Sequence, residues 1–174
     1  AGYYIPADGD PDSYPLVLAE KILSDGRSSR LYQSLVYYKQ LAVQADANGN
    51  FTEDSNLFFA ILVMNSGASV DEGEKALNDE LRILATEPVS DKDLEKAKNK
   101  VRAEFAFGRQ SVQEKAQLLG YAAVINKDAA TVNKEYDLFM KVTRDDIMRV
   151  AKTYFKPENR TVLIVMPSQN DGGK

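Results

Sequence analysis

The apolar run from Leu57 to Met64 is the feature of this 174-residue sequence that most restricts its fold. Such a run predicts a β-strand over residues 56–65 that is apolar on both faces. Residues 41–50 alternate between polar and apolar, which predicts a second strand, and residues 51–55 suit a hairpin connection between the two. A strand that is apolar on both faces is either covered on both sides or central, with a partner domain against its far face.

Helix start signals lie on both sides of this hairpin. Ser13, followed by Pro15 in the first turn, predicts the cap of one helix, and the pair Ser28–Ser29 predicts the cap of a second. After Gly67 the pattern is helical almost to the end of the chain. Capping boxes, in which a hydroxyl residue is followed three positions later by an acid, are predicted at Ser90–Asp93, Ser111–Glu114 and Thr143–Asp146. Pro157 ends the last helix, and residues 160–166 predict a final strand.

The order of these elements indicates an α+β fold. The sequence predicts two helices between the first strand and the hairpin, and several more before the last strand. A mainly antiparallel sheet with helices covering one face accounts for this order. The length suits one domain, residues 1–167, followed by a flexible polar tail, residues 168–174. The chain runs directly into the strand-like Tyr3–Ile5 with no signal peptide, which is typical of a domain from a longer protein.

The chain contains no histidine and no cysteine, which excludes most side-chain chemistry of hydrolases. There is no imidazole base, no thiolate nucleophile and no imidazole or thiolate ligand for zinc. The net charge of −4 and the absence of a basic block argue against a nucleic-acid partner. The longest apolar run is too short to span a membrane. From the residues alone we expect a non-catalytic globular domain with no catalytic or metal-binding residue, and both the bacterial periplasm and the cytoplasm are compatible with it.

Three residues are candidates for contact with a substrate. Arg30 could hold a peptide carboxylate or carbonyl, or it could pair with an acid inside the domain. Tyr32 and Tyr37, together with Tyr38, could form an aromatic surface for an extended peptide, or one or more of them could pack in the core. The acidic residues Asp91, Asp93 and Glu95 are expected to complement the dipole of the helix that they begin.

Several ordered motifs resemble the second, "inactive" domain of the pitrilysin/insulinase family of zinc metallopeptidases. The first is Ser28-Ser-Arg-Leu-Tyr32, which follows a glycine-bearing loop, and Lys39-Gln-Leu-Ala42 then leads into the first hairpin strand. The second, residues 86–98, resembles the family's turn into a long helix with an acidic start, and the third, residues 154–162, resembles its closing helix and last strand. Together the motifs cover nearly the whole chain.

The resemblance implies a processing peptidase/LuxS-like metallopeptidase fold. It also implies different roles for this domain and a preceding domain of the parent enzyme. Zinc would be bound by a preceding domain of the parent enzyme, while this chain would bind no cofactor. It would form scaffold and part of the wall of a peptide-enclosing chamber, with a second half or subunit of the family as a further partner. In the non-catalytic half of some members of the family an Arg and a Tyr contact bound substrate, and the resemblance places these positions at Val36 and Val43 here. That replacement indicates the zinc-bearing half or a member that lost the pair, and the first is the simpler interpretation. A catalytically inactive partner subunit and a self-associating domain unrelated to proteolysis are the alternatives.

Overall fold

A computed structural model describes residues 1–166 of the chain, so the whole predicted tail, residues 168–174, lies outside the described residues. The strands are β1 (Gly2–Ile5), β2 (Ala42–Gly49), β3 (Asn56–Met64) and β4 (Arg160–Thr161). The helices are α1 (Ser13–Ser24), η1 (Tyr32–Tyr38), α2 (Val70–Thr86), α3 (Asp91–Phe107), α4 (Val112–Val124), α5 (Thr131–Lys141), α6 (Arg144–Tyr154) and η2 (Pro157–Asn159). No helix of residues 1–166 is long and apolar enough to cross a membrane.

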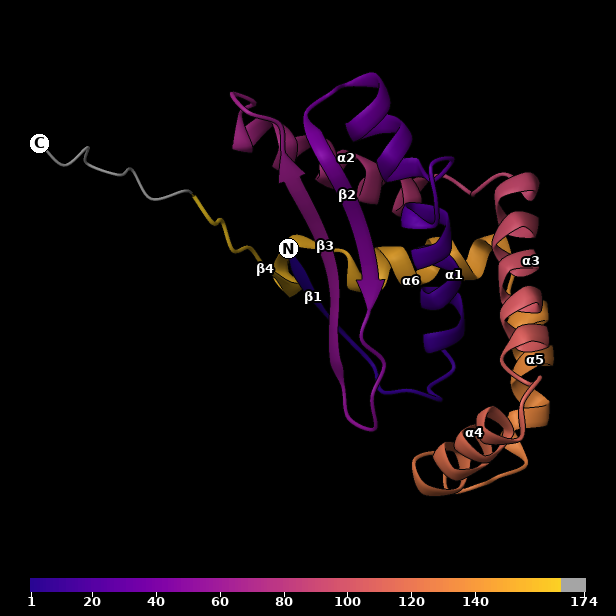
Figure 1. Ribbon diagram of the computed structural model, residues 1–174. Coiled ribbons are helices and arrows are strands. Elements are labelled where there is room, and N and C mark those ends of the chain that lie inside the picture. Colours follow the sequence, from indigo (N-terminus) through magenta and orange to yellow (C-terminus); the bar gives the residue numbers. More distant parts are fainter. Residues whose placement is uncertain (167–174) are drawn as a thin grey trace, which may run out of the picture.

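The four strands form one antiparallel sheet in the order β2-β3-β1-β4 (Figure 1). The long hairpin of β2 and β3 matches the predicted strands 41–50 and 56–65 closely. The short strand β1 lies between β3 and β4, with Gly2 opposite both Phe59 and Thr161. The predicted α+β architecture is confirmed.

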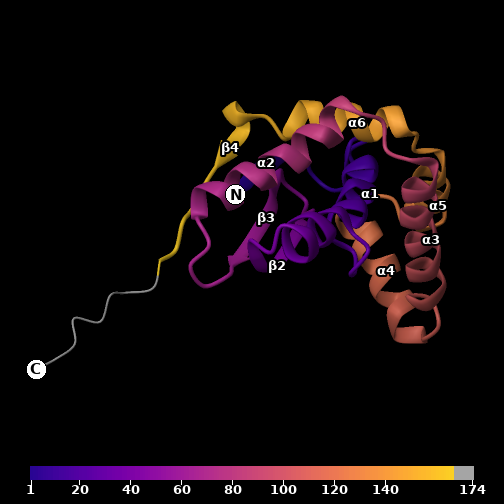
Figure 2. The ribbon, with the colours of Figure 1, turned by 90° about the horizontal axis from the view of Figure 1, so that it is seen from above.

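One face of the sheet is covered by helices and carries the core. Its buried side chains are Tyr3, Ile5, Ala45, Ala47, Phe58 and Ala60. They pack with buried residues of α1, α2 and α6, including Leu16, Leu23, Leu77, Leu81, Leu84, Ile147 and Val150. The ring of Phe155 joins the two layers, with its centroid 5.4 Å from that of Tyr3 and 4.8 Å from that of Phe58. Helices α3, α4 and α5 lie together at the end of the molecule farthest from β4 in both views (Figures 1 and 2).

Two of the three predicted capping boxes form in full. At Thr143 the hydroxyl accepts a hydrogen bond from the N–H of Asp146, and the Asp146 carboxylate accepts one from the N–H of Thr143. The same reciprocal bonds join Ser111 and Glu114. At Ser90 only the first half forms, because the carboxylate of Asp93 is directed toward Arg30 instead.

Two helix starts near the amino end differ from the prediction. Helix α1 begins at Ser13, but the Ser13 hydroxyl donates to the carbonyl of Asp10 at 2.7 Å and caps nothing. Ser29 is buried and its hydroxyl has no hydrogen-bond partner within residues 1–166, so it does not cap the next helix either. That helix continues as the π-helix η1, in which Lys39 N–H donates to Ser34 C=O across five residues. A serine before a helix can therefore accept a capping hydrogen bond from the backbone, but its surroundings in the fold determine whether that bond forms.

The final strand is much shorter than predicted. Only Arg160 and Thr161 pair with β1, and residues 162–166 have no strand partner among the described residues. Their β-forming composition is as expected, but β1 extends no farther than Gly2 in that direction, so no backbone groups lie opposite them.

Candidate functional site

The open face of the sheet is the most unusual surface of this chain. On β3, the inward-facing Phe58 and Ala60 are 0% and 1% exposed, whereas the outward-facing Ile61 and Val63 are 52% and 45% exposed. Further outward-facing apolar side chains are Tyr4, Val43 and Phe59. An antiparallel sheet with one solvated face normally carries polar residues there. A contiguous apolar surface at this place indicates a site of interaction.

Polar residues border this open face along β2. Gln44 lies opposite Val63, Asp46 opposite Ile61 and Asn48 opposite Phe59. The amide of Gln44 donates to the carboxylate of Asp46 at 2.5 Å, so the two side chains are linked along the strand. The surface therefore has an apolar centre on β3 and a polar rim on β2, which is the usual anatomy of a protein interface.

A β-bulge places Val43 on this face. The pairing passes from Ala42 opposite Met64 directly to Gln44 opposite Val63, so Val43 is the extra residue. As a result Ala42 is buried while Val43 and the next residue are both exposed. Val43 thus lies on the open face. It is one of the two positions at which the sequence resemblance implies a substrate-binding residue in other members of the family. Val36, the other, is half-buried against the core.

The three substrate-contact candidates do not form one cluster. The Arg30 guanidinium points to α3, where its Nη2 lies 3.9 Å from Asp93 Oδ2, and Tyr32 is half-buried. Tyr37 is 61% exposed, and its ring meets that of Tyr38 edge to face at 5.1 Å. The interpretation of Arg30 as an internal ion pair fits this geometry, and Tyr37 is the candidate that a ligand reaches without rearrangement.

The described residues hold no group suited to zinc. Among residues 1–166 there is no cluster of three or more side chains that could ligate a metal ion. The whole chain also lacks the imidazole and thiolate ligands that zinc sites in proteins are built from. Zinc therefore does not fit the residues of this chain.

Glu20 is the most buried carboxylate near the hairpin, and its role is structural. Burial raises its pKa above the ordinary value, although the Gly49 N–H, which donates to Oε2 at 2.9 Å, acts in the opposite direction. The bond ties α1 to the end of β2. Because the carboxylate is already used to satisfy a backbone N–H, Glu20 is not placed as a general acid or base.

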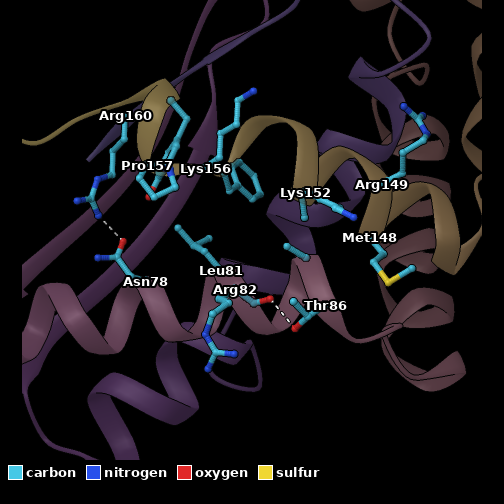
Figure 3. A pocket seen from close by; sticks show the side chains of 14 residues that line it. Asn78, Leu81, Arg82, Thr86, Met148, Arg149, Lys152, Lys156, Pro157 and Arg160 are labelled. Carbon is cyan, nitrogen blue, oxygen red and sulfur yellow. Dashed lines mark hydrogen bonds between the residues drawn. The ribbon is translucent and has the colours of Figure 1, made fainter.

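A groove on the helical side of the molecule was not anticipated from the sequence. It lies between α2 and α6 and has a volume of about 830 Å³ (Figure 3). Its lining includes the apolar Leu81, Ala151 and Phe155 and the cations Arg82, Arg149, Lys152, Lys156 and Arg160. Arg160 is held by Asn78 at 2.6 Å and Glu74 at 3.0 Å. The described residues that line this groove include no carboxylate, so it has no acid–base pair for hydrolysis.

Comparison with known proteins decides the family. The model of the peptidase M16 inactive domain family matches residues 2–101, more than half of the chain. This chain belongs to that family. The kinship indicated by the three sequence motifs is confirmed.

Relatives of this M16 inactive domain are bacterial proteases. The zinc protease PqqE of Helicobacter pylori is 28% identical over 166 residues, which are 95% of this chain and 37% of that protein. A protease structure from Helicobacter pylori superposes with a TM-score of 0.83 at 28% identity, covering 91% of this chain and 38% of that one. An inactive peptidase domain from Bordetella parapertussis gives 0.84 at 26% identity, covering 98% and 92%.

The M16 inactive domain described here thus spans little more than a third of the curated relative that it matches. By contrast, it accounts for almost the whole of the Bordetella parapertussis domain.

Proposed function

We propose that this chain is the non-catalytic C-terminal domain of a zinc-dependent metalloendopeptidase. It forms scaffold and part of the wall of a peptide-enclosing chamber, and the zinc site lies on a preceding N-terminal domain. The observation that carries the proposal is the open apolar face of the sheet. It occurs in a chain that belongs to a peptidase family but has no histidine or cysteine to bind zinc itself.

The open face supports a covering role because of its chemistry. Ile61 and Val63 are about half exposed although they belong to β3, an inner strand of the sheet. Leaving such side chains in water forgoes roughly 25 cal/mol for each Å² of apolar surface. A neighbouring domain or an extended peptide laid against β3 recovers that free energy, and the polar rim on β2 stays hydrated.

The chemistry of the complete enzyme belongs to the other domain. There a zinc ion would supply an activated water for attack on a peptide bond. This chain would stabilise the structure of the chamber, and its open face would exclude bulk water. The exposed ring of Tyr37 would contact bound peptide.

The first test uses the longer protein that contains this domain. Replacing both Ile61 and Val63 by Asp puts two charges on the open face, and we expect hydrolysis of a quenched peptide to fall at least about tenfold because chamber assembly is lost. Bound zinc should stay stoichiometric. The matched control is Val112→Asp, an exposed apolar residue of α4, which should leave hydrolysis unchanged. Full activity of the double variant would contradict a role for this face.

The second test uses the 174-residue chain itself. It should neither retain stoichiometric zinc nor hydrolyse the quenched peptide, because it carries no imidazole or thiolate ligand. Zinc retention with turnover would overturn the proposal. A longer protein that binds no zinc yet activates a zinc-bearing subunit would instead identify an inactive partner subunit.

Tyr37 provides a test of peptide contact. In the longer protein, Tyr37→Ala removes an exposed ring, and we expect KM for peptide to rise several-fold with kcat nearly unchanged, as for a contact made equally in the ground and transition states. Tyr37→Phe keeps the ring and should retain most of the affinity. Equal KM values for the wild type and both variants would exclude Tyr37 as a contact.

A further inference from the structure

Within residues 1–166, part of β3 has no strand neighbour on the edge that faces β1. Residues 56–59 pair with β1, and Ala60 exchanges backbone hydrogen bonds with Ala1, each 2.8 Å long. Backbone groups of successive strand residues point to alternate edges. On the β2 side, bonds are made by Leu57 and Asn65, both odd-numbered. Leu62 and Met64 therefore direct their N–H and C=O groups away from β2, toward the position that a longer β1 would occupy.

The segment Val162–Met166 lies on the other side of that position. It follows β4, which pairs with β1 from the opposite edge. Arg160 faces the helices and Thr161 the open face, and the alternation continues, because Val162 and Ile164 are 38% and 51% exposed but Leu163 and Val165 are 80% and 83% exposed. Five consecutive apolar residues keep a strand pattern without a strand partner among the described residues.

An apolar groove, called the slot below, lies between Leu62 and Met64 of β3 on one side and residues Val162 to Val165 on the other, which form its two walls. A cavity of about 120 Å³ is lined by Leu62 and Met64 of β3, by Val162 to Val165, and by Val70, Glu74 and Leu77 of α2. Because β1 separates β3 from β4, the walls begin two strand spacings apart, about 9.5 Å. That width fits one strand.

We infer that this slot receives one more β-strand, in line with β1, and that the strand is the apolar segment of polypeptide leading from the preceding domain into β1. The inference rests on the proposed function for the existence of that domain. The register in which β1 pairs with β3 determines which segment this is. A strand that pairs with Leu62 and Met64 and runs antiparallel to β3 has its carboxyl end at the nitrogen of Ala1, so it continues β1 without a break.

The slot also specifies the side chains of its occupant. Positions opposite Leu62 and Met64 face α2, where Val70 and Leu77 require apolar partners. Positions opposite Ile61 and Val63 join the open face. The domain boundary would then be a shared strand of the sheet and not a flexible linker, which fixes the orientation of the preceding domain.

The inference is tested by amide hydrogen exchange on the chain with and without an added segment. One version carries Thr-Val-Thr-Val-Thr before Ala1, which places Val opposite Leu62 and Met64. The matched control carries Gly-Ser-Gly-Ser-Gly. We expect the amides of Leu62 and Met64 to exchange at least about tenfold more slowly with the Thr/Val segment, because their N–H groups gain acceptors. The amide of Ile61, which faces β2, should change little.

Equal exchange rates of Leu62 and Met64 in all three proteins would overturn the inference. A second comparison varies the opposite wall of the slot. In the Thr/Val version, Ile164→Asp, which faces α2, should abolish the added protection, whereas Val112→Asp, at an exposed apolar residue of α4 that does not line the cavity, should retain it. Equal effects of the two would also contradict the slot.

This experiment separates the inference from the proposed function. Slow exchange of Leu62 and Met64 in a longer protein that binds no zinc would support the slot and refute the peptidase proposal. Fast exchange in a longer protein that binds zinc and hydrolyses peptide would refute the slot alone.

Discussion

The carboxylate of Asp12 accepts a hydrogen bond from the guanidinium of Arg149, with 2.7 Å between Oδ1 and Nη2. Its other oxygen accepts one from the hydroxyl of Tyr154 at 2.9 Å. Asp12 immediately precedes α1, and both donors lie on α6, so one side chain joins two helices that are distant in sequence. The Arg149 bond lowers the pKa of Asp12, while burial and the bond to Asp12 raise the pKa of Tyr154 to about 12.

Replacing Asp12 by Ala should lower the free energy of unfolding by about 1–2 kcal/mol, since it removes two hydrogen bonds to a charged group that is 19% exposed. Urea denaturation of the 174-residue chain measures this. Asp54→Ala, in the exposed hairpin loop, is the control and should change stability by less than about 0.5 kcal/mol. Equal effects would show that the link between α1 and α6 contributes nothing.

The carboxylates of Asp12 and Glu20 predict opposite pH dependences. The pKa of Asp12 is lowered in the folded state, so its stabilisation is present above the ordinary value of 3.8 and is lost as the pH falls through the folded pKa. The pKa of Glu20 is raised, so the folded state gains stability as the pH falls from the folded pKa toward 4.5.

Glu20→Gln should therefore weaken the pH dependence just above 4.5 and leave stability at pH 7 equal or higher, because the amide oxygen still accepts from Gly49. Denaturation midpoints at pH 4.5 and pH 7 measure both effects. A marked loss of stability at pH 7 would contradict the view that the charge of Glu20 is unfavourable.

The capping box of α6 should make a measurable contribution to stability. Thr143→Ala removes the hydroxyl that caps the helix, and we expect a loss of about 1 kcal/mol. Thr153 lies in the same helix but bonds back to the carbonyl of Arg149, an interaction that stabilises helices little. Thr153→Ala should therefore cost clearly less, and the reverse order in thermal or urea denaturation would be inconsistent with capping.

Adjacent phenylalanines of β3 should respond differently to truncation. Phe58 is fully buried against Phe155, so Phe58→Ala should cost roughly 3–5 kcal/mol. Phe59 is on the open face, and Phe59→Ala should cost less than about 1 kcal/mol in the 174-residue chain. A loss of several kcal/mol at Phe59 would mean that the open face is part of this domain's own core.

Local patterns predicted those parts of the fold that depend on neighbours in sequence. The hairpin strands follow from the run at residues 57–64, and the capping boxes at Ser111 and Thr143 follow from pairs three residues apart. The apolar outer face of β3 was also apparent, since both alternating sets of the run are hydrophobic.

The errors arose where a distant group decides the outcome. The Asp93 carboxylate turns to Arg30 across the fold, so the box at Ser90 stays incomplete. Residues 162–166 have strand composition, but pairing needs a partner that local sequence cannot supply. The groove between α2 and α6 brings together segments far apart in the chain, and no spacing rule could have found it.

The bulge at Val43 has a consequence for behaviour in solution. Strand β2 is an edge of the sheet, and a regular edge offers evenly placed backbone donors and acceptors that invite pairing with another copy of the protein. The extra residue breaks that spacing, and the charge of Asp46 is repelled by the same group on an approaching copy. Two molecules of this domain are thereby discouraged from pairing along β2, even in a concentrated protein solution.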